Sequence, residues 1–419
     1  MKHVGYSGKE IVDRVIPSPS EAKERIRELE RVAITGRIAR ECIGIAYGFF
    51  TPLEGFMGKA DVEAVCEKMT LANGTLWSIP IVFDIAGEEI GEKGIKERDT
   101  ILLVYRERAL AILEVHEVFN YNKTKMAQAV LGTTDVKHPG VRMFNDLKDT
   151  FIGGKVTLVN IPKFNPPFDK FFYTPKQLRE KFEEKGWQRV VAHQTRNVPH
   201  TGHEWLMKGA WFSANGDLPV EKLRTGLLVS CIIGPKQVGD YIDEAIVLGH
   251  QKLHEARYFR DDVHMVSVAL WDMRYAGPKE AIFHAILREN LGCTHHMFGR
   301  DHAGVGSYYD PYDAHRIFDQ IPEGSLSIKP IRVLEWWYCP ICGEVTYSGL
   351  CGHNQESQGF SGTMIRSMIQ NKVKPTKLIL RPEVFDVLNE CADRYGFGSP
   401  FCTRKYLSKR QPVFELSVM

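Results

Sequence analysis

The sequence lacks a charge excess of one sign, a long apolar run and an apolar leader. Its 54 Lys and Arg face 52 Asp and Glu, so the formal net charge is only +2. Such a balance excludes the broad positive field that captures nucleic acid or an anionic membrane. No apolar run approaches the roughly 20 residues that span a bilayer, and residues 1–20 lack the apolar segment of a secretory signal. We therefore expect a cytoplasmic protein that binds neither nucleic acid nor membrane.

Two common nucleotide-binding and metal-binding patterns are also missing. The absence of a Gly-x4-Gly-Lys-Ser/Thr loop excludes a P-loop kinase domain, and the His200–His203 turn lacks the His-Glu-x-x-His spacing of metalloproteases, which argues against zinc at that turn. The nine cysteines are odd in number and mostly lie in apolar stretches, as in a reducing compartment. Only Cys339, Cys342 and Cys351 are clustered, and they need a separate explanation.

The N-terminal part of the chain, residues 1–167, has the pattern of a mixed α/β unit with much strand. Three prolines within residues 161–169 mark its end. Gly and charged residues separate its strand-like runs, which predicts an antiparallel meander. The expected elements are a helix over 20–31 capped by Ser20, and strands over 78–85, 100–105 and 109–118.

Residues 168–330 repeat a different pattern, in which an apolar strand is followed by a loop and then by a helix. This alternation predicts an α/β fold with a parallel sheet, and ligands of such sheets bind at the carboxyl ends of the strands. The loops after Ala192, Ile233, Leu270 and Phe298 are therefore the candidate ligand loops. The expected strands cover 190–192, 226–233, 263–270 and 294–298, and the helices that follow them cover 200–212, 238–250, 279–291 and 313–320.

The loop after the first of these strands carries the first candidate site. His200 and His203 are three residues apart, so both lie on one face of a helical first turn, where unpaired N–H groups favour an anion. Arg196 adds a fork suited to phosphate or sulfate. The simpler alternative is a solvated turn with a mere cap, but the convergence of polar groups favours a function. The candidate residues are Gln194, Thr195, Arg196, Asn197, His200 and His203.

The loop after the fourth strand carries the second candidate site, whose glycines let the backbone approach a ligand closely. A tight connection is the alternative explanation for this loop. Its residues are Gly299, Arg300, Asp301, His302, Ala303 and Gly304.

A third candidate site has the pattern C-x2-C-x8-C-x-H, formed by Cys339, Cys342, Cys351 and His353. Three thiolates and an imidazole are a common ligand set of tetrahedral zinc, and four protein ligands leave no open position, so the metal is expected to be structural. Three free thiols near one another are the alternative.

Together the first two sites resemble the sulfate adenylyltransferase (ATP sulfurylase) family. Gln194-Thr195-Arg196-Asn197 with His200 and His203 is similar to the family's Q-T-R-N…H-x-x-H motif, and Gly299 to Gly304 to its G-R-D-H-A-G motif. Further similarities lie at Phe50 to Gly58 and at Ser361-Gly362-Thr363 with Arg366. His193 stands where many relatives carry an aromatic residue, and its role stays open.

The resemblance implies three domains: a β-rich PUA-like domain over 1–167, a Rossmann-like nucleotidylyltransferase domain over 168–330, and a small C-terminal domain with zinc over 331–419. It points to prokaryotic zinc-containing members without a kinase extension. It also implies the reaction ATP + sulfate ⇌ adenylyl sulfate (APS) + pyrophosphate, Mg²⁺ carried by ATP, and a homodimer.

The resemblance also assigns roles to single residues. Arg196, Gln194 and the backbone of Ala303 would bind sulfate. The residues expected to bind ATP are Gln194, Thr195, Arg196, Asn197, Gly299, Arg300, Asp301, His302 and Leu334. The catalytic residues are expected to be Thr195, Arg196, Asn197, His200 and His203.

Two other functions compete with this one. Some nucleotidylyltransferases join ATP to a phosphorylated small molecule through a similar histidine turn, but the Gln-Thr-Arg-Asn stretch and the second motif argue against that acceptor. PUA-like domains and zinc clusters also occur in RNA-binding proteins, but the chain has no basic stripe.

Overall fold

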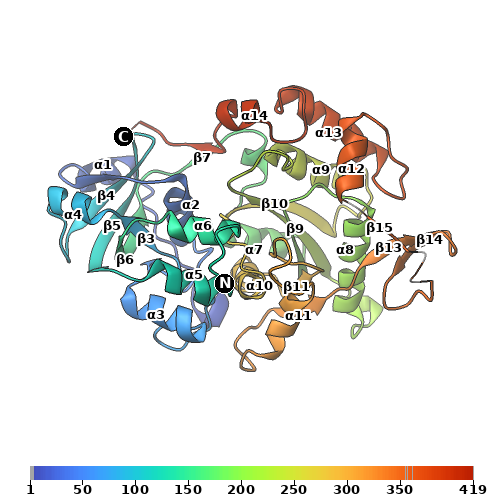
Figure 1. The fold of residues 1–419 in the computed structure, drawn as a ribbon, viewed down its shortest axis with the longest axis horizontal. Helices are drawn as coiled ribbons and strands as arrows, with labels where there is room; N and C mark the ends of the chain where they lie inside the picture. Colours follow the sequence, from blue (N-terminus) through green and yellow to red (C-terminus); the bar gives the residue numbers. More distant parts are fainter. Residues whose placement is uncertain (1–3, 354, 356, 361, 419) are drawn as a thin grey trace.

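A computed structural model describes residues 4–353, 355, 357–360 and 362–418 of the chain. Two sheets form its frame and lie side by side, the N-terminal one on the left in Figure 1 and the central one on the right. Among the described residues, none of the helices combines the length and the apolarity needed to cross a membrane.

The N-terminal sheet has the order β1-β4-β5-β6-β2, with β3 also paired to β6. Strands β4, β5 and β6 are antiparallel neighbours, as the meander pattern predicts. The strands are β1 (Glu30–Ala33), β2 (Gly55–Phe56), β3 (Phe83–Ile85), β4 (Thr100–Tyr105), β5 (Arg108–Phe119) and β6 (Thr150–Leu158). The helices around them are η1 (Tyr6–Gly8), α1 (Pro19–Arg25), α2 (Gly36–Ala46), α3 (Lys59–Lys68), α4 (Gly87–Lys93), α5 (Lys123–Leu131) and α6 (Pro139–Asn145).

Two N-terminal expectations were wrong in their bounds. The first helix ends at Arg25 and is capped by Ser18, whose side chain accepts from the Glu21 N–H, rather than by Ser20. Pro19 explains the shift, because proline favours the first helical position. The strand expected over 78–85 covers only Phe83–Ile85, where the chain pairs with β6.

The central sheet is parallel throughout and has the order β10-β9-β8-β11-β12. Its strands are β8 (Arg189–Thr195), β9 (Thr225–Ile233), β10 (His264–Leu270), β11 (His295–Phe298) and β12 (Lys329–Arg332). The helical elements are α7 (Pro175–Glu184), α8 (Thr201–Asn215), η3 (Val220–Lys222), α9 (Asp243–Glu255), α10 (Pro278–Asn290), α11 (Asp313–Arg316) and η4 (Ile317–Asp319). This arrangement is the predicted α/β fold.

One helix of this region starts later than its sequence pattern predicts. The helix expected from Val238 begins at Asp243, because Gly239 adopts a φ of 93° and breaks the helical path. The residues between β9 and α9 thereby form a loop at the carboxyl edge of the sheet.

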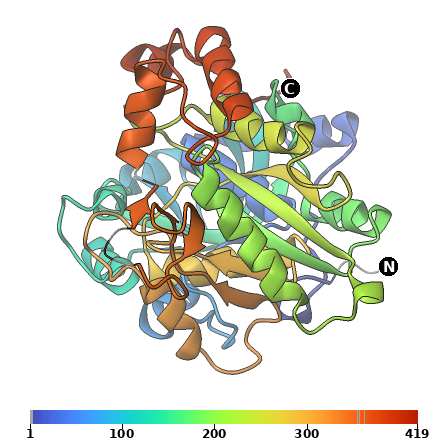
Figure 2. The ribbon, with the colours of Figure 1, turned by 90° about the vertical axis from the view of Figure 1, so that its right-hand side faces the viewer.

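The C-terminal part of the chain packs on both halves. A small sheet of β13 (Trp336–Cys339), β14 (Glu344–Tyr347) and β15 (Gln358–Gly359) lies beside α8 (Figure 2). Strand β16 (Phe414–Glu415) returns to pair with β7 (Lys163–Phe164), which is followed by η2 (Phe168–Lys170). The remaining helices are α12 (Gly362–Gln370), α13 (Pro382–Arg394) and α14 (Arg404–Lys409).

A buried network of charges joins the N-terminal half to the central sheet. Arg274, in the loop after β10, forms an ion pair with Glu41 of α2, and their side chains are only 2% and 3% exposed. Arg37 also contacts Glu41, at 2.7 Å. Each buried charge therefore depends on its partners, because an unpaired charge in such a site is costly.

We predict that Arg274→Ala lowers the free energy of unfolding by about 3 kcal/mol, because it removes one partner of the buried Glu41 carboxylate. Urea unfolding measures this loss. Lys374→Ala is the control, because Lys374 and Asp386 form an exposed pair at 3.1 Å whose loss costs about 0.5 kcal/mol. Equal losses in the two variants would contradict the prediction.

Candidate active site

The two central sequence motifs meet at one cavity of about 350 Å³ at the carboxyl edge of the parallel sheet. His203 and Arg300, one from each motif, both line it. The other predicted residues on its wall are Gln194, Thr195, Arg196, Asn197, Gly299, Asp301, His302, Ala303 and Gly304. His200 and Leu334 lie outside this wall. The His200 ring is 3.9 Å from that of His203 between centroids, and the Leu334 N–H donates to the Tyr347 hydroxyl at 3.0 Å.

The turn between β8 and α8 places the two histidines. His200 is the N-cap residue of α8, and its Nδ1 accepts a hydrogen bond from the Gly202 N–H at 3.1 Å. The Thr201 N–H donates to the Ile379 carbonyl at 3.0 Å. Two of the N–H groups that the sequence predicts to be free for an anion are thus already engaged. These two N–H groups are therefore not available to an anion in this structure.

Arg196 is the fixed positive charge at the centre of the site. Its guanidinium donates to the Tyr275 hydroxyl and to the Pro235 carbonyl at 3.3 Å, and it lies 3.8 Å from Asp240. Burial disfavours the charge, but Tyr275 and Asp240 raise the pKa of Arg196 above its ordinary value. Arg196 therefore stays protonated at any physiological pH.

Gln194 and the second loop supply neutral donors. Gln194 lines the cavity, and its Nε2 donates to His284 Nδ1 at 2.8 Å. Asp301 and Ala303 adopt left-handed φ values of 53° and 55°. The Ala303 carbonyl accepts from the Gly277 N–H at 3.0 Å, which ties this loop to the loop after β10.

Three histidines line the cavity, and burial keeps their imidazoles neutral. Burial, assisted by the repulsion of neighbouring imidazoles, holds the pKa of His193 and His302 well below the ordinary value. Burial also lowers the pKa of His203 to about 4. At pH 7 these rings can donate or accept hydrogen bonds without carrying charge.

Several residues on the cavity wall lie outside the two central motifs. Lys236 and Asp240 follow β9, and Met273 and Tyr275 follow β10, where the sequence pattern predicted ligand loops without naming residues. Arg366 of α12, which the late motif includes, also reaches the wall. Ser361 of that motif lies outside the described residues.

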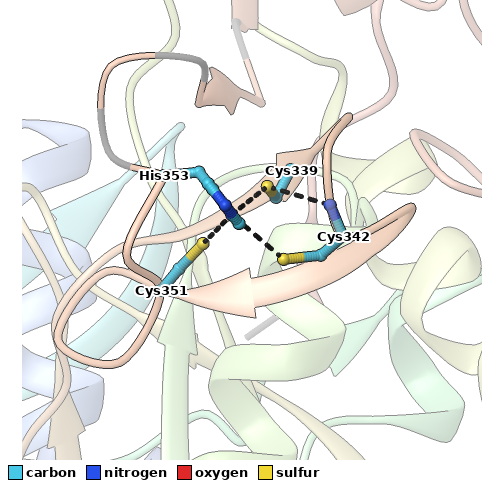
Figure 3. A group of neighbouring side chains, drawn as sticks. All are labelled: Cys339, Cys342, Cys351 and His353. Carbon is cyan, nitrogen blue, oxygen red and sulfur yellow. Dashed lines mark hydrogen bonds between the residues drawn. The ribbon is translucent and has the colours of Figure 1, made fainter.

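The cysteine cluster forms a separate candidate metal centre. Cys339, Cys342, Cys351 and His353 converge on one point in Figure 3, and their ligand atoms all lie within 4.8 Å of one another. His353 Nδ1 is 3.7, 3.4 and 3.9 Å from the sulfurs of Cys339, Cys342 and Cys351. Tetrahedral zinc with Zn–S of about 2.3 Å and Zn–N of about 2.0–2.1 Å sets such ligands about 3.6 Å apart. The donor set and spacing therefore fit a zinc ion.

The strands around this cluster touch the active-site helix. Trp336 of β13 stacks on Trp205 of α8 at 5.2 Å between centroids, and Phe360 stacks on His200 at 5.6 Å. The candidate metal centre is therefore placed to fix one wall of the active site.

A parallel α/β sheet with a basic, histidine-rich cavity at its carboxyl edge defines a nucleotide-binding protein that handles polyanions. Comparison with known families specifies this class further. The ATP-sulfurylase family model matches residues 169–391, and a PUA-like domain model matches residues 4–161. The chain belongs to the ATP-sulfurylase family, and the predicted enzyme family and PUA-like N-terminal domain are confirmed.

Relatives named sulfate adenylyltransferase match almost the whole chain. The protein of Archaeoglobus fulgidus is 38% identical over 98% of this chain and 96% of its own. That of Hyperthermus butylicus is 39% identical over 91% of this chain and 94% of its own. A solved structure, the hexameric APS kinase from Thiobacillus denitrificans, shares the fold with a TM-score of 0.70 at 18% identity, over 92% of this chain and 68% of that one.

We predict that the buried histidines make the protein acid-sensitive. Burial lowers the pKa of His250 to about 3, against about 6.5 in the unfolded chain. As the pH falls from 7 to 5, this histidine becomes protonated in the unfolded chain but stays neutral in the folded protein. This difference alone lowers the free energy of unfolding by about 2 kcal/mol. Urea unfolding of the wild type and His250→Gln at both pH values measures the difference. The variant should lose about 2 kcal/mol less between pH 7 and 5, and an unchanged pH dependence would contradict the assignment.

Proposed function

We propose that the chain is a sulfate adenylyltransferase, which converts ATP and sulfate to APS and pyrophosphate. The observation that carries this proposal is the meeting of Arg196 and the Gly299–Gly304 loop in one cavity. A triphosphate and a tetrahedral dianion can therefore lie side by side there.

The chemistry suits a site without a charged general base. A sulfate oxygen attacks the α-phosphorus, the bond to the bridging oxygen breaks, and pyrophosphate leaves in line. Sulfate is already a dianion at pH 7, so no proton has to be removed. The barrier is the approach of one anion to another, which positioning and charge stabilisation lower.

Sulfate is assigned to the inner part of the cavity. Arg196 offers a charged fork, Gln194 its side-chain amide, and Ala303 its backbone N–H. The last group forms no hydrogen bond within the described part of the chain, so it is free to donate to a sulfate oxygen.

The nucleotide is assigned to the outer part of the cavity. Thr195 and Asn197 orient the phosphates, and the neutral imidazole of His203 donates an N–H bond as negative charge grows on the α- and β-phosphates. His200, whose ring packs 3.9 Å from that of His203, would have to turn toward the cavity to donate in the same way. The backbone and side chains of Gly299, Arg300, Asp301 and His302 hold the nucleotide, with Leu334 beside the adenine. Mg²⁺ enters with ATP and neutralises part of its charge. Self-association as a homodimer in the cytoplasm is part of the same proposal.

The metal of the cysteine cluster is assigned as structural zinc. Cys339, Cys342, Cys351 and His353 supply four ligands, so no open position remains for catalysis. The zinc would hold the β13–β15 sheet in shape and, through Trp336, keep it against α8.

We predict that Arg196→Ala abolishes sulfate-dependent release of pyrophosphate, with a loss of at least about a hundredfold, because a charged donor to the sulfate disappears. The assay compares sulfate, molybdate and a phosphorylated small molecule as acceptors. Arg316→Ala is the matched control, because Arg316 is an exposed arginine paired with Asp310 and Asp313. Near-normal turnover by Arg196→Ala, or turnover only with the phosphorylated acceptor, would refute the proposal.

We also predict one zinc per chain in protein purified without chelator. Elemental analysis should find this ratio in the wild type and in Cys66→Ala, which changes a buried thiol far from the cluster along the chain. Cys342→Ser should lose the metal and unfold at a lower temperature, because one of four ligands is gone. Wild-type protein without metal would defeat the assignment.

A further inference from the structure

Tyr275 is the closest polar neighbour of the Arg196 guanidinium. Its hydroxyl accepts a hydrogen bond from Arg196 Nη1, and the guanidinium carbon lies 5.5 Å from the centre of its ring. Both side chains line the active-site cavity. Tyr275 belongs to neither sequence motif and comes from the loop after β10.

The backbone of Tyr275 is held in an unfavourable conformation. Its φ of 58° lies in the left-handed region, which a bulky residue rarely adopts. His138 Nδ1 accepts from the Gly140 N–H at 3.0 Å, so Nε2 carries the proton and donates to the Tyr275 carbonyl at 3.2 Å. Residues that are held in such strained conformations cluster at functional sites. The N-terminal half of the protein thus fixes this tyrosine.

Arg196 has a second partner that competes with any bound anion. Asp240 lies 3.8 Å from its guanidinium and also lines the cavity. An arginine that swings onto this carboxylate would lose its charge-assisted bond to sulfate.

The structure also provides room for Arg196 to leave its position. A second cavity of about 400 Å³ lies between the N-terminal half and the central sheet. Arg196 and Tyr275 line both this cavity and the active-site cavity. The two side chains thus form part of the wall between these cavities. Packing alone therefore does not hold the guanidinium.

We propose that Tyr275 is a positioning residue of the sulfate site, whose hydroxyl holds Arg196 toward the bound anion and away from Asp240. The inference rests on the proposed function and deepens it. In this division of roles Arg196 binds the sulfate, and the Tyr275 hydroxyl keeps Arg196 in place.

The test is Tyr275→Phe, which keeps the ring as a wall and removes only the hydroxyl. KM for sulfate should rise about tenfold, while KM for ATP and kcat at saturating sulfate should change less than about twofold. Tyr173→Phe is the control. The Tyr173 hydroxyl donates to the Lys170 carbonyl at 3.1 Å, and its side chain lines a different cavity from the one that Arg196 lines. This control should leave KM for sulfate unchanged.

A rescue variant tests the competition itself. Asp240→Asn removes the charge but keeps an oxygen for its bond from the Gln237 N–H, which is 2.9 Å long. In the Tyr275→Phe background it should restore most of the sulfate affinity, because Arg196 no longer has a rival carboxylate. A purely structural role for Tyr275 would instead lower the melting temperature and would not be rescued.

The outcomes separate this inference from the proposed function. Wild-type protein without sulfate-dependent pyrophosphate release overturns the function and the inference together. If the wild type releases pyrophosphate normally, three results overturn the inference but leave the function intact. These are an unchanged KM for sulfate in Tyr275→Phe, a rise in its KM for ATP by the same factor, and a failure of Asp240→Asn to rescue it. A selective and rescued rise in KM for sulfate supports it.

Discussion

The active site depends on the parallel pairing of β8 with β11. These strands are far apart along the chain, yet Val191 lies opposite His295 and Ala192 opposite His296. Parallel neighbours end at the same edge of a sheet, so the loops that follow them must meet. The motif after β8 brings Arg196 and the histidine turn, and the motif after β11 brings the glycine-rich loop. A slip in this register would separate the two halves of the cavity.

Electrostatics explains why so many histidines surround a site for anions. A row of charged imidazoles would be unstable in a buried cavity, and burial keeps His193, His203 and His302 neutral. Arg196 retains its charge because Tyr275 and Asp240 favour it. The fixed charge of the cavity therefore comes from its arginines, Lys236 and two aspartates, and the neutral imidazoles add N–H donors that can respond to charge developing on a substrate. Such preorganised donors are effective where water is excluded.

The fold class, the family and the residues of both central motifs could be predicted from the sequence, because they depend on local patterns. Strand and helix periodicity gave the parallel sheet, although the start of α9 was missed because Gly239 stops the helix. The partners of side chains could not be predicted. The sequence predicts a free Thr201 N–H, but this group donates a hydrogen bond to the Ile379 carbonyl. Tyr275 was missed because its loop has no motif spacing, and the only signal was its place after a strand of the sheet.

The cavity belongs to the central sheet, but its geometry is set from both sides by other parts of the chain. On one side His138 of the N-terminal half bonds to the Tyr275 carbonyl. On the other side Phe360, which follows β15, stacks on His200. The first contact reaches a residue on the cavity wall, and the second reaches a residue packed against His203 of that wall. Without these contacts Tyr275 and His200 would each lose a neighbour that holds it in place. The central sheet thus lies between a PUA-like domain and a C-terminal module with the cysteine cluster, and both contribute contacts at the cavity.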